Sequence, residues 1–276
     1  MFTCELSLKE IDVAISALDP VDAKIANLTS WSLKPLQKKE DIVVHFRLAK
    51  VLSDTFYALR VRDAFAPNVA PANARIVGSS QLTDAIELGA AMLHRNQELP
   101  ADGMFLRAGQ SFVMSAAGCP LIIAGARGVM VIAHAARDSL VDRGALQGKP
   151  TRKHLSVVNA IIEELGRYNI LAPEISMIML FAIPATAFEH NETHPVHGAY
   201  NRLLIQHIDA QYPYGIIRKD GKTFLDLEQV FIGQARQAGV RGMWATHSLG
   251  AFSHLAHTCD GKGTDRRNLY VVRRNS

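Results

Sequence analysis

The sequence predicts a single mixed α/β domain. From residue 104 onward, short apolar runs typical of buried strands alternate with longer stretches whose apolar residues recur at helical spacing. No long linker, repeat or low-complexity tract interrupts this alternation. With 48% hydrophobic and 20% charged residues, the composition is that of a globular protein, and 276 residues are enough to bury a substantial core.

The N-terminal part is expected to be a divergent, partly helical portion of this domain, covering residues 1–65 of a domain that spans 1–276. Residues 6–18 carry apolar side chains at spacings that predict a helix, and an Asp-Pro pair follows them. Residues 41–59 begin like a strand and continue like a helix. Further along, the alanine-rich composition of residues 85–94 also favours a helix.

Strands and helices then follow in a regular order. Short apolar runs predict strands over residues 104–106, 111–114, 119–124, 129–134, 174–183, 240–246 and 269–272. Helical spacing predicts helices over residues 154–168, 199–208 and 224–239. The first of these helices has the clearest apolar face, formed by Val157, Val158, Ile161, Ile162 and Leu165. Gly239 suits the end of the last one, because glycine is the residue preferred at helix C-termini.

Charge and cysteine usage narrow the class of protein. The net charge of +4 comes without a basic stripe interleaved with aromatic residues, so nucleic acid is not an expected partner. The three cysteines, Cys4, Cys119 and Cys259, are too few for a disulfide framework and indicate a reducing compartment. The longest apolar stretch, residues 175–188, is too short to span a bilayer. We therefore expect a cytoplasmic protein that acts on a small molecule and has no membrane partner.

Cys119 and His134 form the most informative pair of residues. They stand at the far ends of two apolar runs joined by a glycine turn at residues 125–128. An antiparallel hairpin brings such ends together, so the thiol and the imidazole are predicted to be neighbours at one end of a sheet. That arrangement suits either an activated nucleophile or two ligands of a soft metal. The alternative is that both residues have only a structural role, with the cysteine buried as a small apolar side chain beside a hydrogen-bonded histidine.

Three stretches of the sequence resemble the laccase-domain family, the YfiH/YlmD-like proteins. Residues 101–120 resemble the family's Ala-Asp-Gly element followed by a strand and a cysteine, and residues 131–135 resemble its strand ending in His-Ala. The third stretch is C-terminal and follows the family's order of short motifs in residues 224–227, 237–240, 252–254 and 265–268. The order and spacing of these motifs together make the resemblance more specific than any single motif does.

The resemblance implies a four-layer α-β-β-α sandwich. It also implies a zinc site of two histidines and one cysteine, and purine nucleoside phosphorylase or adenosine deaminase activity. Cys119 and His134 match the cysteine and one histidine of that site. The family's Gln-Val-His-Gly element corresponds to residues 81–84, which places Thr83 where the other histidine should be. A hydroxyl is a poor zinc ligand beside imidazole and thiolate, so the alignment implies that one metal ligand is replaced.

Arginines near these motifs are candidates for substrate binding. Arg137 follows the His134 motif and corresponds to the family's arginine with a gap of one residue, while Arg266 and Arg267 lie in the C-terminal stretch. Guanidinium groups recognise phosphate bidentately, and nucleoside phosphorolysis needs a positioned phosphate. We therefore expect these arginines, together with Thr83, to contact the substrate.

Three functions remain open from the sequence. The first is purine nucleoside processing, with Cys119 and His134 holding zinc or orienting phosphate. The second is a metal-free cysteine hydrolase, because the resemblance extends to glutamine deamidases of the cytotoxic necrotizing factor type, which share this fold and use a cysteine and a histidine. The third is a binding protein that has kept the fold and lost the chemistry, as the replacement at Thr83 would suggest.

A histidine-rich segment, residues 189–197, is a weaker candidate. It places three histidines and two acids close together, which could bind a divalent metal. Pro195 prevents a helical metal motif, so a solvated loop is the expected structure. Such a loop could still border the active site, since loops often carry functional groups on a rigid scaffold.

Overall fold

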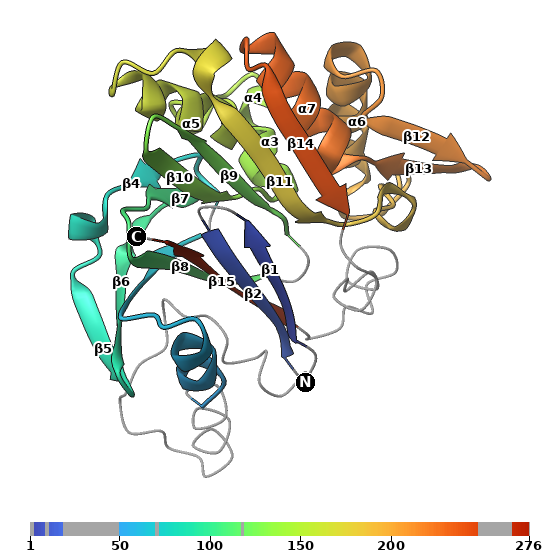
Figure 1. Cartoon of the computed structure of the whole chain (residues 1–276). Coiled ribbons are helices and arrows are strands. Elements are labelled where there is room, and N and C mark those ends of the chain that lie inside the picture. Colours follow the sequence, from blue (N-terminus) through green and yellow to red (C-terminus); the bar gives the residue numbers. More distant parts are fainter. Residues whose placement is uncertain are drawn as a thin grey trace.

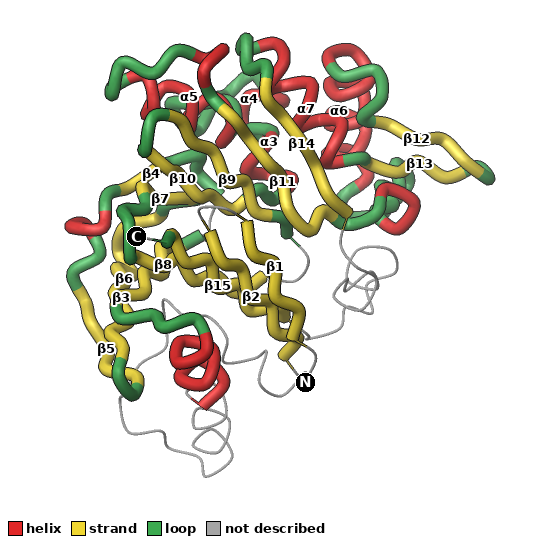
Figure 2. The backbone as a smooth tube through the Cα atoms, viewed as in Figure 1, coloured by secondary structure: helices red, strands yellow, loops and turns green. Residues whose placement is uncertain are grey.

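The fold is a stack of four layers in which two β-sheets lie face to face and helices cover their outer faces (Figures 1 and 2). The computed structural model describes residues 3–8, 11–18, 50–69, 72–116, 119–247 and 267–275. The four-layer α-β-β-α arrangement predicted from the resemblance is therefore confirmed. Over the described residues, no helix combines the length and apolar character that crossing a membrane requires.

The first sheet has seven strands in the order β1-β2-β15-β8-β3-β6-β5. Its strands are β1 (Thr3–Leu8), β2 (Ile11–Leu18), β3 (Asp63–Asn68), β5 (Asp84–Leu88), β6 (Ala91–Pro100), β8 (Gln110–Ala116) and β15 (Arg267–Arg274). A helix over residues 50–58 covers its outer face (Figure 2). The apolar layer between that helix and the sheet includes Leu52, Phe56, Leu93, Val113 and Val271.

The second sheet has six strands in the order β14-β11-β9-β10-β7-β4. Its strands are β4 (Ile76–Val77), β7 (Gly103–Phe105), β9 (Leu121–Ala126), β10 (Val129–His134), β11 (Ser176–Ala182) and β14 (Gly242–His247). The helices on its outer face are α3 (Arg137–Leu140), α4 (Arg143–Leu146), α5 (Val157–Gly166), α6 (Gly198–Gln211) and α7 (Leu227–Gln237) (Figure 1). The small remaining elements are η1 (Ser79–Gln81), η2 (Ala172–Glu174), η3 (Ala185–Ala187) and the hairpin β12 (Ile216–Lys219) and β13 (Lys222–Leu225).

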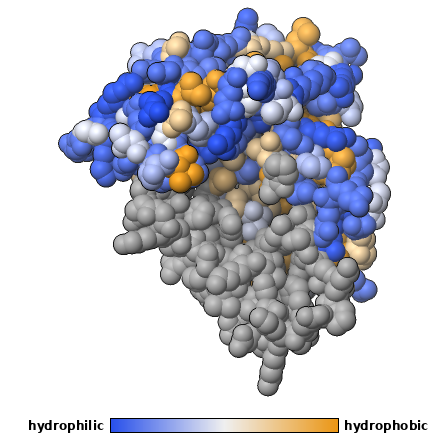
Figure 3. Space-filling model, turned by 180° about the vertical axis from the view of Figure 1, so that it is seen from behind, coloured by the Kyte–Doolittle hydropathy of each residue, from blue (hydrophilic) through white to orange (hydrophobic). Residues whose placement is uncertain are grey.

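Strand β9 shows why the central strands are apolar without alternation. Leu121 and Ile123 pack into the core between the two sheets, whereas Ile122 and Ala124 pack into the core beneath the helices. Successive side chains of a strand point to opposite faces, so a strand covered on both faces needs apolar residues throughout. The surface seen from behind is mainly hydrophilic over the described elements (Figure 3).

Two predicted helices are in fact strands. Residues 6–8 and 11–18 fall in the antiparallel pair β1 and β2, and residues 85–88 and 91–94 fall in the antiparallel pair β5 and β6. In β5, Ile86 and Leu88 are buried while Glu87 between them is exposed, which is the period-two pattern of a half-buried strand. Alanine content favoured a helix there, but pairing in the sheet outweighs that weak local preference.

Other boundaries differ less. The helix predicted over residues 224–239 is α7, which begins only at Leu227, since residues 222–225 form β13. Asp226 caps this helix by accepting a hydrogen bond from the Gln229 N–H at 3.1 Å. Of the segment 41–59, the helical continuation is confirmed over residues 50–58, and residues 41–49 lie outside the described part.

The sheet leaves no room for a side chain at Gly103. A Cβ there would lie 2.6 Å from the Ala133 Cβ and collide with the Ile132 carbonyl oxygen, both on strand β10. We expect Gly103→Ala to lower the free energy of unfolding by about 3 kcal/mol, because backbone atoms must move. Gly166→Ala is the matched control, since a Cβ there meets nothing within 4 Å, and its effect should stay within about 1 kcal/mol. Urea unfolding of both variants measures this, and equal stabilities would contradict the predicted collision.

Candidate active site

Cys119 and His134 meet at one end of the second sheet. Strands β9 and β10 form the predicted antiparallel hairpin, in which His134 is paired with Leu121, two residues after Cys119. The Ala135 N–H donates to the Pro120 carbonyl at 2.9 Å, which extends the pairing to the residue beside the cysteine. The Cys119 side chain lies within hydrogen-bonding reach of the His134 imidazole and is half-buried. The predicted proximity of the two side chains is confirmed.

Asp102 fixes the orientation of His134. Its carboxylate is fully buried, and Oδ1 lies 3.2 Å from His134 Nδ1 and accepts a hydrogen bond from Ser139 Oγ at 2.9 Å. The other oxygen, Oδ2, accepts the N–H groups of Asn73 at 2.8 Å and Ala74 at 2.5 Å. Because Nδ1 is engaged by this carboxylate, proton exchange with the Cys119 sulfur falls to Nε2. The arrangement is a cysteine–histidine–aspartate chain, the order found in nucleophilic enzymes.

The surroundings of His134 favour its protonated form. Burial alone would lower the pKa of His134, but the negative charge of the Cys119 sulfur and hydrogen bonds from Asp102 and Cys119 outweigh it and raise that pKa to about 10. The imidazolium therefore places a positive charge between the Asp102 carboxylate and the Cys119 sulfur. The thiolate is the nucleophilic form of cysteine.

Arg137 adds a second positive charge to this cluster. Burial alone would lower the pKa of Arg137, but the hydrogen bond and the charge of the adjacent Asp138 outweigh it and raise that pKa, with smaller contributions from Tyr200 and from the Cys119 sulfur. Asp138 holds the arginine by accepting from Nε at 2.8 Å, and it accepts the Tyr200 hydroxyl at the same distance. On the other side, Arg137 Nη1 lies 3.4 Å from His190 Nε2. The guanidinium is therefore fixed from two directions.

His190 is the neutral member of this cluster. It is buried, whereas residues 191–197 are exposed or half-buried as predicted for this loop, and its Nδ1 lies 3.1 Å from the Phe188 carbonyl oxygen. Burial and the charge of Arg137 lower the pKa of His190 to about 4. Nδ1 therefore carries the proton and donates to the carbonyl, which leaves Nε2 to accept from Arg137. His194 and His197 of the same segment stack on each other nearer the surface.

The two buried histidines are expected to differ in charge at every pH near neutrality. A raised pKa keeps His134 as an imidazolium, and a lowered pKa keeps His190 neutral, from about pH 5 to about pH 9. Long-range ¹H–¹⁵N correlation spectra of the imidazole rings measure this directly, with His134→Gln and His190→Gln used for assignment. A His134 ring that titrates near the ordinary histidine value would contradict the charge assigned to the site.

The structure places Thr83 away from this centre. Thr83 is exposed between η1 and β5, and no described contact joins it to Cys119 or His134. Arg266 lies outside the described residues, and Arg267 opens β15 with only its backbone described, so substrate binding by these two arginines stays a prediction. The side chain of Arg137 is described, and it lies in the site.

Several residues of the site are not among those predicted. Asp102 stands in the Ala-Asp-Gly motif, but nothing local in the sequence shows that it would reach His134. Strand pairing of β7 with β10 places it there, since Ala133 is paired with Gly103. Ser139 and His190 likewise arrive through tertiary contacts. The signal that could have identified Asp102 is a single acid enclosed by apolar residues, because such an acid is buried only when it has partners.

The described residues do not fit the three-ligand zinc centre that the resemblance implies. Within the described ranges, no three histidine, cysteine or acidic side chains gather as metal ligands. Cys119 and His134 offer one sulfur and one nitrogen, and the Asp102 oxygens are already taken by four hydrogen-bonding groups. The positive charge of Arg137, which interacts electrostatically with Cys119, also opposes the binding of a metal cation there. No step of the chemistry below passes through a metal.

Comparison with known proteins identifies the fold. No protein-family model and no curated protein sequence matches this chain. Among solved structures, a Neisseria meningitidis protein of the DUF152 family model is similar, at 13% identity and a TM-score of 0.56 over 99% of both chains. YfiH from Bacillus licheniformis is 14% identical, with a TM-score of 0.59 over 96% of this chain and 93% of that one. YlmD from Geobacillus stearothermophilus is 15% identical, with a TM-score of 0.59 over 97% and 93%.

These neighbours carry the names to which the sequence motifs pointed, and the fold that the resemblance predicted is confirmed. The fold and the site together define an α-β-β-α protein of the DUF152/YfiH fold with a Cys119–His134–Asp102 chain at the end of its second sheet.

Proposed function

We propose that this protein is a metal-independent cysteine hydrolase that cleaves a carboxamide, the reaction class of glutamine deamidation. One observation carries the proposal: the half-buried sulfur of Cys119 lies against the imidazole of His134, which is in turn held by the buried carboxylate of Asp102. A nucleophile, a proton carrier and an orienting group in this order are what covalent amide hydrolysis requires.

In the first half of the proposed reaction, the Cys119 thiolate attacks the carbonyl carbon of the amide and forms a carbon–sulfur bond. Negative charge develops on the carbonyl oxygen, and the fixed Arg137 guanidinium provides a positive charge close to the reacting sulfur. The His134 imidazolium then donates its Nε2 proton to the leaving nitrogen. The carbon–nitrogen bond breaks, ammonia departs, and a thioester remains on Cys119.

In the second half, His134 acts as a base. The neutral imidazole formed by the first proton transfer takes a proton from a water molecule, whose oxygen attacks the thioester carbon. The carbon–sulfur bond breaks, the product leaves as a carboxylic acid that releases its proton to solvent, and the thiolate–imidazolium pair is restored. Asp102 keeps the imidazole in one orientation throughout and does not change its own protonation.

The test is ammonia release from glutamine-containing peptides by the purified protein, with conversion of glutamine to glutamate followed by mass spectrometry. Activity without added metal, insensitive to chelators and lost on alkylation of Cys119, is the expected result. Cys259→Ser is the matched control, since another cysteine should be replaceable without loss. If no carboxamide is hydrolysed and no thioester forms, the proposal is wrong.

Purine nucleoside processing is the second candidate function, and Arg137 favours it. A guanidinium held within interaction distance of Cys119 by Asp138 and His190 could bind phosphate as readily as a developing oxyanion. The assay is phosphate-dependent release of base from inosine or adenosine, and inosine formation from adenosine, each with and without added zinc. Base release or inosine formation that is lost in Arg137→Gln would favour this candidate. If the protein turns over neither nucleosides nor amides, the non-catalytic binding role is the candidate that remains.

A further inference from the structure

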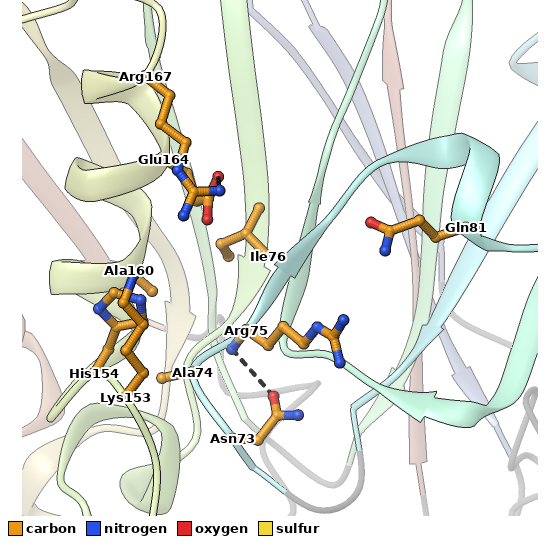
Figure 4. Close-up of a pocket in the computed structure, with 10 residues that line it drawn as sticks. All are labelled: Asn73, Ala74, Arg75, Ile76, Gln81, Lys153, His154, Ala160, Glu164 and Arg167. Atoms are coloured by element: carbon orange, nitrogen blue, oxygen red, sulfur yellow. Dashed lines mark hydrogen bonds and ion pairs between the residues drawn. The ribbon is translucent and has the colours of Figure 1, made fainter.

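A hollow of the molecule lies beside the candidate active site rather than in it. It is a cavity of about 440 Å³ between helix α5 and the segment that runs from residue 73 through strand β4 to η1 (Figure 4). This size falls within the range of small-molecule sites. Ala74, Ile76 and Ala160 form apolar parts of its wall.

Positive charge dominates the lining of this cavity. Arg75, Lys153 and Arg167 line it, against a single acid, Glu164 (Figure 4). Arg167 is paired with Glu164 at 2.8 Å, and Lys153 is paired with Glu163 outside the lining. The Arg75 guanidinium makes no ion pair or hydrogen bond with a described residue. Glu163 and Glu164 therefore neutralise two of the three cations that line the cavity, and one positive charge remains.

Hydrogen-bonding groups complete the lining. Gln81 uses its Oε1 to accept from the Gly78 N–H at 2.9 Å, which leaves its amide NH₂ group as a donor to a ligand. His154 adds no positive charge at neutral pH, because burial lowers its pKa. Glu164 lies across the cavity from Gln81 and provides an acceptor (Figure 4). A ligand that fits this lining carries an anionic group, and the rest of it combines hydrogen-bonding groups with apolar surface.

The segment that contributes Arg75 to the cavity also makes hydrogen bonds to Asp102 of the candidate active site. The N–H groups of Asn73 and Ala74 donate to the Asp102 carboxylate, at 2.8 and 2.5 Å. The Arg75 carbonyl accepts the backbone N–H groups of Asp102 and Gly103, at 2.9 and 3.1 Å. A ligand that draws Arg75 into the cavity therefore acts on the residues that set the position of the Asp102 carboxylate.

We propose that this cavity binds a small phosphate-bearing molecule of nucleotide size, and that its binding changes the reactivity of Cys119 through residues 73–75 and Asp102. Arginine and lysine at one site suit a phosphate group, which accepts several charge-assisted hydrogen bonds. Binding is independent of the proposed hydrolase function, whereas the effect on Cys119 rests on it. The two parts are therefore measured separately.

Isothermal titration with AMP, inorganic phosphate and adenosine tests the site. AMP should bind to the wild-type protein, and adenosine should bind much more weakly because it lacks the anionic group. Arg75→Gln should weaken AMP binding by about tenfold or more, the effect of one charge-assisted contact. Arg107→Gln, which removes an exposed arginine between β7 and β8, is the matched control and should bind AMP like the wild type.

Three results overturn the proposed site: no AMP binding by the wild type, equal binding by Arg75→Gln, or binding lost in Arg137→Gln and kept in Arg75→Gln. The last would place the nucleotide in the candidate active site instead.

The coupling between the cavity and Cys119 is tested by alkylation. The rate of Cys119 alkylation by iodoacetamide should change severalfold on AMP saturation in the wild type and stay constant in Arg75→Gln. A wild-type rate that does not respond to demonstrated AMP binding removes the coupling and leaves the site. Absence of amide hydrolysis with intact AMP binding would count only against the hydrolase function.

Discussion

Replacing Cys119 by alanine is expected to abolish amide hydrolysis, with kcat/KM falling by about 10³-fold or more. The sulfur forms the covalent bond to the substrate in the proposed reaction, and no described neighbour can take its place. His134 and Arg137 would remain, but neither is a nucleophile for an amide carbon. The measurement is ammonia release by wild-type and Cys119→Ala protein under identical conditions. Circular dichroism of the variant confirms that the fold persists.

The matched controls test whether the loss of activity is specific to Cys119 or follows from removing any cysteine. Cys4→Ser and Cys259→Ser should retain wild-type turnover, because neither thiol belongs to the described chain of Cys119, His134 and Asp102. A Cys119→Ala variant that keeps more than about a tenth of the wild-type rate would be incompatible with covalent catalysis at this sulfur. Turnover by another route, such as phosphate-dependent base release, would then have to be examined.

Asp102→Ala is expected to give the largest loss of stability in the site, about 3–5 kcal/mol. The carboxylate is fully buried and accepts from the Asn73 and Ala74 N–H groups and from Ser139 Oγ while facing His134. Alanine leaves all of these groups without their acceptor in a place that water does not reach. Urea unfolding followed by fluorescence measures the difference from the wild type.

The control for Asp102 is an acid that has no ion pair or side-chain hydrogen bond with another described residue. Glu87 is exposed on strand β5, so Glu87→Ala should change the free energy of unfolding by no more than about 0.5 kcal/mol. Asp102→Asn adds a second comparison, because it keeps one oxygen acceptor and removes the negative charge. It should be more stable than Asp102→Ala and still react slowly at Cys119. Equal stability of Asp102→Ala and Glu87→Ala would mean that the buried network is not formed.

The sequence was most informative where the structure depends on local order. The apolar runs around Cys119 and His134 are separated only by a glycine turn, so their pairing could be predicted from hairpin geometry alone. Helix α5 was equally clear, because its apolar spacing is long and regular and Ser156 caps its start. In both cases the decisive neighbours are close in the chain.

Features that depend on distant partners could not be predicted in the same way. The sequence pattern of strands β1 and β2 resembles that of a helix, but β2 pairs with β15 at the opposite end of the chain, and β1 pairs with β2. Asp102 joins the site from the position just before strand β7, and His190 joins it from the segment after β11. Thr83 illustrates the converse, since alignment of a motif placed it at the metal site while the structure leaves it exposed elsewhere.

The most direct test of the account is the rate at which iodoacetamide alkylates Cys119 in wild-type protein and in His134→Gln, read by mass spectrometry at neutral pH. The account predicts faster modification of Cys119 than of Cys4 or Cys259, and a rate about tenfold lower once the imidazolium is removed. His207→Gln, on helix α6 away from the site, should leave the rate unchanged. Equal rates in wild type and His134→Gln would show that the imidazole does not activate this sulfur.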